Sequence, residues 1–394
     1  MDPSNSDADF PWHLGIFDAH CHPTDTLSNL PLIPSMRAKV LTVMATRAQD
    51  QQLVAQAAND MGVTEEDVAS EDMDWRQSHK IIPSFGWHPW FSHQMFDEAD
   101  YDGATSLSLD QKVAHYESVL TPTPTSPDFL RALPQPQPFG HFVSQTRTHL
   151  QQYPLALVGE VGLDRSFRIP EAWLPQELEQ RDDALTPGGR EGRKLSPYRV
   201  SMEHQKKVLT AQLHLAGETQ RAVSMHGVQA HGVVFETLAA TWKGHERHVP
   251  SKREKKLQEA AAKRSAEPAE EKVESPSPTP KPYPPRVCLH SYSGPAEAVK
   301  QYVAPSVPCD VFFSFSTTIN AWSDSAEDGK VEAAVRAVPD NRVLVESDMH
   351  IAGDEMDHQL EQAVRKICQV KQWPLEEGVK QLRSNWRRFV FGRE

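Results

Sequence analysis

The chain has 394 residues, a length that suits one large domain with insertions better than a small single core. It carries 41 Lys and Arg against 54 Asp and Glu, which gives a formal net charge of −13. This charge argues against a surface that adheres generally to nucleic acids or membranes, although a pocket can still take an anionic substrate.

The N-terminus and the cysteines indicate an intracellular protein. Residues 1–13 are polar and acidic, where a secretory signal would be basic and then apolar, and we expect them to be flexible. The four cysteines are scattered, without a C-x-x-C pair, which favours a reducing compartment. No apolar run approaches the roughly 18 residues that span a bilayer. We therefore expect no membrane association and a location in the cytoplasm, the nucleus or both.

Short apolar runs alternate along the chain with segments of helical periodicity. Eight runs are predicted β-strands: 14–20, 39–44, 81–86, 155–160, 222–226, 286–291, 311–315 and 342–346. Helices are predicted between most of them and after the last: 47–58, 141–152, 198–219, 232–241, 295–303, 329–338, 355–371 and 375–390. This α/β pattern predicts a single (β/α)8 TIM barrel over residues 14–394.

Three stretches interrupt the pattern and are predicted surface insertions. Residues 97–140 contain TPTPTSP and LPQPQPFG, residues 165–197 mix Pro, Gly and alternating charge, and residues 243–286 run from SKREKK into ESPSPTPKPYPP. Such compositions bury too little apolar surface to offset the entropy of ordering the chain. We expect surface loops, the last of them disordered.

Six potential metal ligands lie at or just past the ends of predicted strands. They are His20, His22, Glu160, His226, His290 and Asp348. The carboxyl ends of all strands in a barrel open onto one face, so ligands that are distant in sequence converge there. Together these imidazoles and carboxylates predict a metal site in which the position of Glu160 suits a ligand that bridges two divalent ions, with Mg²⁺, Mn²⁺ and Zn²⁺ as the candidates.

The first three candidates differ in how strongly the sequence indicates that they bind metal. His20 and His22 point to the same side of a strand, which suits one metal ion, but an ordinary surface pair has the same spacing. Glu160 ends an apolar strand, where a carboxylate is costly to bury unless it is paired or bound to metal. A salt bridge across the top of the barrel would also satisfy Glu160.

Among the other three candidates, the two histidines occupy equivalent positions, which strengthens the prediction of a metal site. His226 and His290 each end a strand of small or apolar residues and are followed by a turn. One such histidine is more often a satisfied core residue, whereas two in successive units favour a metal site. Asp348 could hold a metal, act as a general base or cap the next helix. The combination of all six, rather than any one of them, predicts the site.

The motifs FDAHCH, FGWHPW, VGEVGLD, SMH, CLHSYSG and VLVESD, in this order, resemble the TatD family of metal-dependent deoxyribonucleases, a branch of the amidohydrolase-type barrels. The resemblance runs from about Gly15 to the C-terminal NWRRFVFG. It implies a metallo-dependent hydrolase barrel with two metal sites that share Glu160. His20 and His22 would complete one of these sites, and His226 and His290 would complete the other.

The resemblance also bears on catalysis and on partners. Asp348 would contact the first metal and the attacking water, which makes Asp348 and Glu160 the catalytic carboxylates. The family often has Arg where this chain has Val228, and Thr where it has Ser347. The chain looks most like fungal members that are described as interacting with a cell-cycle complex, which implies a possible protein partner.

Substrate contacts are predicted on the same face of the barrel. His88, in the GWHP turn, could donate to a phosphate or simply stabilise that turn. Ser291 and Ser293 precede a predicted helix, where backbone N–H groups could hold an anion. Two cations would activate a water and neutralise charge on a phosphoryl oxygen, so DNA or a small phosphodiester is the expected substrate.

Three functions follow as alternatives. The first is a TatD-like deoxyribonuclease of the exonuclease type. The second is another amidohydrolase that acts on C–N bonds, although such enzymes commonly use a carboxylated Lys where this chain has Glu160. The third is an interaction protein that retains its metal site but has little nuclease activity.

Overall fold

The structure is a computed structural model of the chain that describes residues 10–69, 78–173, 179, 181–256, 280–323 and 329–392. The predicted flexible N-terminus lies mostly outside these residues. About half of the insertion that we expect to be disordered also lies outside them, because positions 257–279 are not described. No helix within the described ranges is long and apolar enough to cross a membrane. All four cysteines are buried and free.

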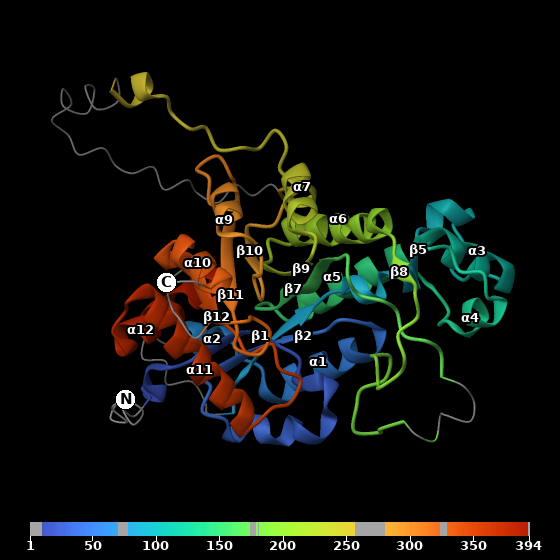
Figure 1. Cartoon of the computed structure of the whole chain (residues 1–394), viewed down its shortest axis with the longest axis horizontal. Helices are drawn as coiled ribbons and strands as arrows, with labels where there is room; N and C mark the ends of the chain where they lie inside the picture. Colours follow the sequence, from blue (N-terminus) through green and yellow to red (C-terminus); the bar gives the residue numbers. More distant parts are fainter. Residues whose placement is uncertain are drawn as a thin grey trace.

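Eight parallel strands form the centre of the molecule (Figure 1). In chain order, which is also their order in the sheet, they are β1 (Phe17–Cys21), β2 (Val40–Met44), β3 (Ile81–Phe85), β7 (Leu157–Asp164), β9 (Val223–Val228), β10 (Arg286–Leu289), β11 (Asp310–Phe315) and β12 (Val343–Val345). The sheet closes where Asp348 N donates to His20 O at 2.9 Å. The predicted (β/α)8 barrel is confirmed.

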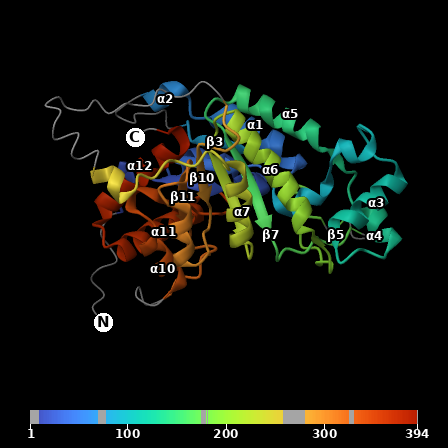
Figure 2. The same cartoon turned by 90° about the horizontal axis from the view of Figure 1, so that it is seen from above.

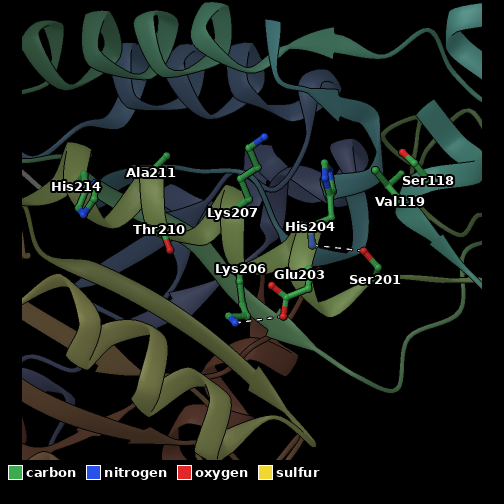
Figure 3. A pocket seen from close by; sticks show the side chains of 10 residues that line it. All are labelled: Ser118, Val119, Ser201, Glu203, His204, Lys206, Lys207, Thr210, Ala211 and His214. Atoms are coloured by element: carbon green, nitrogen blue, oxygen red, sulfur yellow. Dashed lines mark hydrogen bonds and ion pairs between the residues drawn. The ribbon is translucent and has the colours of Figure 1, made fainter. Parts of the chain in front are cut away.

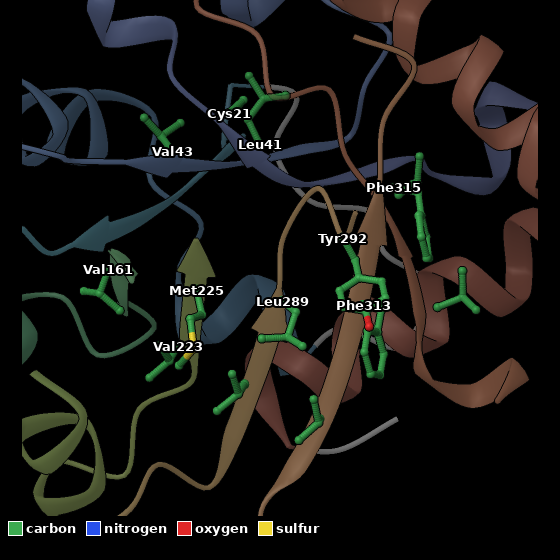
Figure 4. Packing of buried hydrophobic residues seen from close by; sticks show 14 of the residues in the cluster. Cys21, Leu41, Val43, Val161, Val223, Met225, Leu289, Tyr292, Phe313 and Phe315 are labelled. Carbon is green, nitrogen blue, oxygen red and sulfur yellow. The ribbon is translucent and has the colours of Figure 1, made fainter. Parts of the chain in front are cut away.

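Helices surround the strands, as Figure 2 shows from above. They are α1 (Ala48–Met61), α2 (Glu65–Ala69), α5 (Phe139–Gln152), α6 (Met202–Glu218), α7 (His231–Thr241), α9 (Ala296–Tyr302), α10 (Lys330–Ala337), α11 (Asp354–Lys371) and α12 (Leu375–Phe391). Their apolar stripes pack against one face of the strands, with side chains such as Leu41, Val223 and Phe313 between the two layers (Figure 4). This packing fixes the strand ends that carry the site.

A second apolar cluster seals the inside of the barrel. It takes residues from or beside all eight strands, among them Val40, Phe312 and Leu344, and joins them to Trp386 and Phe389 of α12. The Trp386 indole also donates to the Thr42 hydroxyl, 3.1 Å away. The C-terminal helix therefore closes the barrel interior below the polar end, which leaves only the carboxyl ends of the strands for a site.

The segment 97–140 is not the coreless loop that its composition predicted. It contains α3 (Leu109–Val119) and α4 (Pro127–Ala132), which stand apart from the barrel in Figure 1. Tyr116 and Leu130 are buried in a separate small apolar cluster there. The prolines lie between and at the ends of the helices rather than inside them, so a Pro-rich composition conceals two short amphipathic segments.

Short strand pairs connect the insertions to each other. β4 (Met95–Phe96) pairs with β6 (Gln137–Pro138), and β5 (Leu120–Thr121) pairs in antiparallel fashion with β8 (Arg199–Val200). The β5–β8 pair ties the middle of the 97–140 segment to the residues just after the 165–197 segment. Both insertions therefore lie on one side of the barrel.

Candidate metal centre

The six predicted ligands converge at the carboxyl ends of the strands. β1 leads into His20 and His22, β7 carries Glu160, and β9 carries His226. His290 directly follows β10, and Asp348 comes three residues after the end of β12. All but His22 and Asp348 are buried, and these two are half-buried. The tertiary structure thus assembles the whole predicted set, while the role of each member as a metal ligand stays a prediction.

Glu160 lies at the centre of the cluster. Its Oε1 is 2.7 Å from His290 Nε2, 2.9 Å from His226 Nδ1 and 3.0 Å from His88 Nε2. Its Oε2 faces another group, with His22 Nε2 at 3.2 Å and His20 Nε2 at 3.5 Å. The two oxygens of one carboxylate therefore address two different sets of imidazoles.

Asp348 completes the set around Oε2 of Glu160. Its Oδ1 is 3.5 Å from His22 Nε2 and 3.8 Å from His20 Nε2. Its Oδ2 accepts from the Ser291 hydroxyl at 3.0 Å. The backbone of Asp348 is left-handed, with φ of 54°, a conformation that Asp and Asn tolerate better than most residues. This turn aims the carboxylate toward the pocket.

Close contact between β7 and β9 brings Glu160 beside His226. Gly162 pairs with His226 and has φ of 153°. A Cβ at this position would lie 2.1 Å from the carbonyl oxygen of His226, so only glycine permits the approach. The close approach of the two strands thus explains the second glycine of the VGEVGLD motif.

Residues two positions before the ligands form a supporting layer that the sequence analysis missed. Ser224 lies below His226 on the same face of β9, and its hydroxyl is 2.7 Å from His20 Nδ1. Glu346 lies below Asp348 and accepts from Ser291 N and Oγ, both at 2.6 Å. Asp18 lies below His20 and accepts from the Ser347 hydroxyl at 2.5 Å. The period of two along each strand was the signal that could have revealed them.

Asp164 is a further residue that the sequence analysis missed. It follows Glu160 by four residues in β7, so the period of two along the strand could have revealed it as well. Its Oδ2 is 3.2 Å from His226 Nε2 and accepts from the Trp90 indole at 2.6 Å. A carboxylate on the outer nitrogen of a histidine fixes the orientation of the ring and increases the basicity of the other nitrogen. Asp164 therefore directs Nδ1 of His226 toward Glu160.

The electrostatics of the cluster divide its imidazoles: carboxylate contacts raise the pKa of some rings, whereas burial lowers the pKa of His20 and His88. Burial opposes ionisation of Glu160, but the imidazoles of His88, His290 and His20 hold its pKa well below the usual range. Burial likewise opposes a charge on His22 and His290, yet carboxylate contacts raise the pKa of both rings well above the ordinary value. Protons on these rings occupy the place that cations would take, and metal binding would release them.

The donor set fits divalent metal ions. Histidine and carboxylate atoms lie within 4.8 Å of one another in several groups, including His20 with His22 and Asp348, and His88 with Glu160 and His226. Neutral imidazole nitrogens and carboxylate oxygens suit Zn²⁺ and Mn²⁺. Among the residues that the structure describes, the buried Nδ1 of His290 finds no hydrogen-bond partner, although a carboxylate oxygen of Asp348 lies 3.7 Å away.

The predicted substrate residues line the same cavity, which has a volume of about 390 Å³. His88 is buried and its Nε2 faces Glu160, so this ring belongs to the ligand cluster rather than extending into the pocket as a free donor. The amide of Ser291 donates to Glu346 and does not supply the predicted anion cradle. Ser293 is exposed at the rim.

Another hollow, of about 580 Å³, lies along α6 and contains none of the predicted site residues (Figure 3). Two lysines extend over it. Lys206 pairs with Glu203 at 3.3 Å, and Lys207 pairs with Asp97 at 2.7 Å. Because acidic neighbours neutralise both cations, this hollow lacks the chemistry of the cavity at the strand ends.

Comparisons with known proteins agree with this geometry. A family model described as TatD related DNase matches residues 17–391. The Cut9-interacting protein scn1 of Schizosaccharomyces pombe is 39% identical over 376 residues, which cover 95% of this chain and 98% of that protein. An uncharacterized deoxyribonuclease of Saccharomyces cerevisiae is 24% identical over 305 residues, which cover 74% of this chain and 77% of that one.

Among solved structures, an uncharacterized amidohydrolase from Saccharomyces cerevisiae has a TM-score of 0.52 and 13% identity, and covers 95% of this chain and 99% of its own. This likeness concerns the fold alone. The family match spans the segment that contains all six predicted ligands, and it confirms the resemblance that the motifs indicate. The chain therefore belongs to the TatD-related DNases, a family of metal-dependent hydrolases.

Proposed function

We propose that the protein is a deoxyribonuclease of the exonuclease type that hydrolyses phosphodiester bonds with two divalent cations. The observation that carries the proposal is the position of Glu160, whose two oxygens face separate groups of imidazoles. One group, with His20, His22 and Asp348, would hold one cation. The other, with His226 and His290, would hold the second.

Two cations would perform two tasks in phosphodiester hydrolysis, activation of a water and neutralisation of charge. When bound, such a pair lowers the pKa of a water to near neutrality and neutralises charge on a phosphoryl oxygen. Asp348 supports this from the protein side. Burial opposes its ionisation, but contacts with His22, His290 and His20 hold its pKa below the usual range. It is therefore ionised at neutral pH and able to accept a proton as a general base.

The size of the cavity supports hydrolysis at the ends of a DNA strand. A volume of about 390 Å³ falls within the range of roughly 300–1,000 Å³ that is typical of pockets for small ligands. Such a pocket suits one nucleotide and its neighbouring phosphates, whereas a duplex is too wide to enter. Single-stranded DNA with a free end, or a small phosphodiester, is the substrate that this geometry favours.

The test is turnover of single-stranded DNA in the presence of Mg²⁺ or Mn²⁺, with Asp348→Asn as the decisive variant. Asn tolerates the left-handed backbone of this position and can still accept from Ser291. We expect it to retain the fold and to lose about 10²–10⁴ in rate, as is typical when a general base is removed. Equal activity in both proteins would indicate a contaminating nuclease.

A second function is favoured by a separate observation. The relative from Schizosaccharomyces pombe is named for an interaction with Cut9 and is similar over nearly its whole length. We propose that this chain also binds a protein partner of the cell-cycle machinery, in the cytoplasm or the nucleus. Copurification of that partner with wild-type protein and equally with Asp348→Asn would show that the interaction does not depend on catalysis. Failure of copurification with the wild type would contradict it.

The third alternative, an amidohydrolase that acts on C–N bonds, finds less support. Such enzymes commonly place a carboxylated lysine where this chain has Glu160. None of the described residues that line the cavity is a lysine. Hydrolysis of cyclic amides but not of phosphodiesters would favour this alternative.

A further inference from the structure

The insertion 165–197 forms one wall of the metal pocket. Phe167, Gly189 and Arg190 line the cavity together with the predicted ligands. Its composition predicts only a surface loop. Its place in the pocket means that it helps to decide what the pocket binds.

Hydrogen bonds hold this wall firmly against the barrel. The buried Arg47, just before α1, donates from Nε to Pro187 O at 3.0 Å and from Nη2 to Thr186 O at 3.1 Å. Backbone bonds add to this anchor, with Thr186 N to Asp25 O at 3.0 Å and Leu27 N to Ala184 O at 3.0 Å. Because the segment just before Arg190 is fixed in this way, Arg190 has a defined place at the rim.

The charges of the two arginines that line the pocket differ in availability. Arg47 is buried and forms ion pairs with Asp25 at 2.8 Å and with Asp50 at 3.0 Å, so its charge is balanced. Arg190 is exposed, and its Nε donates to Arg193 O at 3.2 Å. Within the described part of the chain Arg190 forms no ion pair, which leaves its terminal nitrogens for an anion from outside.

An aromatic stack lies on the same pocket. The rings of Phe167 and Trp90 are parallel, with centroids 4.2 Å apart and an angle of 8° between their planes. Both side chains are only half-buried. Trp90 is held in place by its indole hydrogen bond to Asp164. Aromatic faces beside a cation are the usual elements of single-strand recognition, because they contact base and backbone without reading sequence.

We propose that Arg190 binds the phosphate next to the scissile one in a single-stranded substrate. This inference rests on the proposed function, in which the scissile phosphate lies at the imidazoles and carboxylates of the strand ends. Arg190 comes from a different wall and forms none of the close contacts of that cluster. A planar guanidinium binds a phosphate through two parallel hydrogen bonds, which Lys cannot reproduce.

The experiment measures binding rather than turnover. A fluorescein-labelled, single-stranded phosphorothioate oligonucleotide, which resists hydrolysis, is titrated with full-length protein in a buffer that contains Mn²⁺, at several salt concentrations. Fluorescence anisotropy gives Kd for wild type, Arg190→Ala, Arg190→Lys and Arg168→Ala. Arg168 is the matched control, because it is exposed in the same insertion but does not line the pocket.

We expect Arg190→Ala to weaken binding by about tenfold or more, as for the loss of a charged hydrogen bond. The slope of log Kd against log salt should fall by about 0.7, which corresponds to one phosphate contact on a single strand. Arg190→Lys should keep the slope and lose less affinity, and Arg168→Ala should resemble wild type.

Three results would overturn the inference: no binding by wild type, unchanged Kd and slope in Arg190→Ala, or an equal loss in Arg168→Ala. Circular dichroism verifies that each variant is folded. The proposed function fails separately, if wild type binds the strand in an Arg190-dependent manner but does not cleave the ordinary phosphodiester form.

Discussion

Replacing Glu160 by Ala should remove both metal ions, whereas replacing any one histidine should remove or weaken only one of them. The reason is the division of contacts at Glu160: three ring nitrogens lie within 3.0 Å of Oε1, and two others lie at 3.2 and 3.5 Å from Oε2. His22, by contrast, lies on the Oε2 side of Glu160, where its Nε2 is also 3.5 Å from Asp348 Oδ1 and 3.0 Å from His20 Nε2.

The loss of metal affinity in Glu160→Ala can be bounded from these contacts. Even a residue that only orients a ligand typically contributes 10–100-fold to metal affinity, so loss of a direct shared ligand should exceed about a hundredfold at each site. A hundredfold corresponds to about 2.7 kcal/mol. Without metal, the variant also removes the carboxylate that raises the pKa of the buried His22 and His290 rings, so these rings should lose their protons and the metal-free protein should be less stable than metal-free wild type.

Metal analysis after dialysis gives the stoichiometry, and thermal unfolding in EDTA gives the stability of the metal-free protein. Glu332→Ala is the matched control, since Glu332 is also a buried carboxylate but lies in α10, where Ser323 N donates to it at 2.7 Å. Two ions in wild type and in Glu332→Ala, with none in Glu160→Ala, is the expected result. Two ions retained in Glu160→Ala, or the same partial loss as in His22→Ala, would refute the shared-ligand role.

Two further predictions concern the parts of the chain outside the metal centre. Replacing residues 251–279 by a short Gly/Ser linker should change the melting temperature by only a few degrees, because loop closure depends weakly on length. Extending the replacement to 285 removes Tyr283, which is 4% exposed and part of the main core, and should cost about 3–5 kcal/mol in urea unfolding. Equal stability of both deletions would show that Tyr283 does not contribute. The second prediction is a loss of stability in acid from His93 and His115, whose pKa values burial lowers to about 3 and about 4. These rings stay neutral in the folded protein, so the unfolded chain takes up more protons below its ordinary histidine pKa of about 6.5, and stability falls from there toward pH 4. Each ring should account for about 2 kcal/mol between pH 7 and pH 5. His93→Gln should therefore reduce the pH dependence of the unfolding free energy by that amount, and an unchanged dependence would contradict the burial argument.

The sequence by itself determined the barrel and its six candidate ligands. Short apolar runs such as VLTVM and VFFSF located all eight strands, because strands that are buried on both faces are apolar along most of their length. His20, Glu160 and Asp348 could be singled out because polar residues at the end of such runs are costly to bury without a partner.

The tertiary structure alone decided how these residues are supported and what surrounds them. Ser224 holds His20 from another strand, which no spacing along the chain encodes. The two helices in 97–140 escaped prediction because their apolar residues bury against each other and against distant neighbours, which composition does not show. Arg190 reaches the pocket on a loop that is anchored by distant residues, among them Arg47, which is separated from Pro187 by 140 residues of sequence. Sequence patterns report local burial, whereas contacts between distant segments depend on the path of the folded chain.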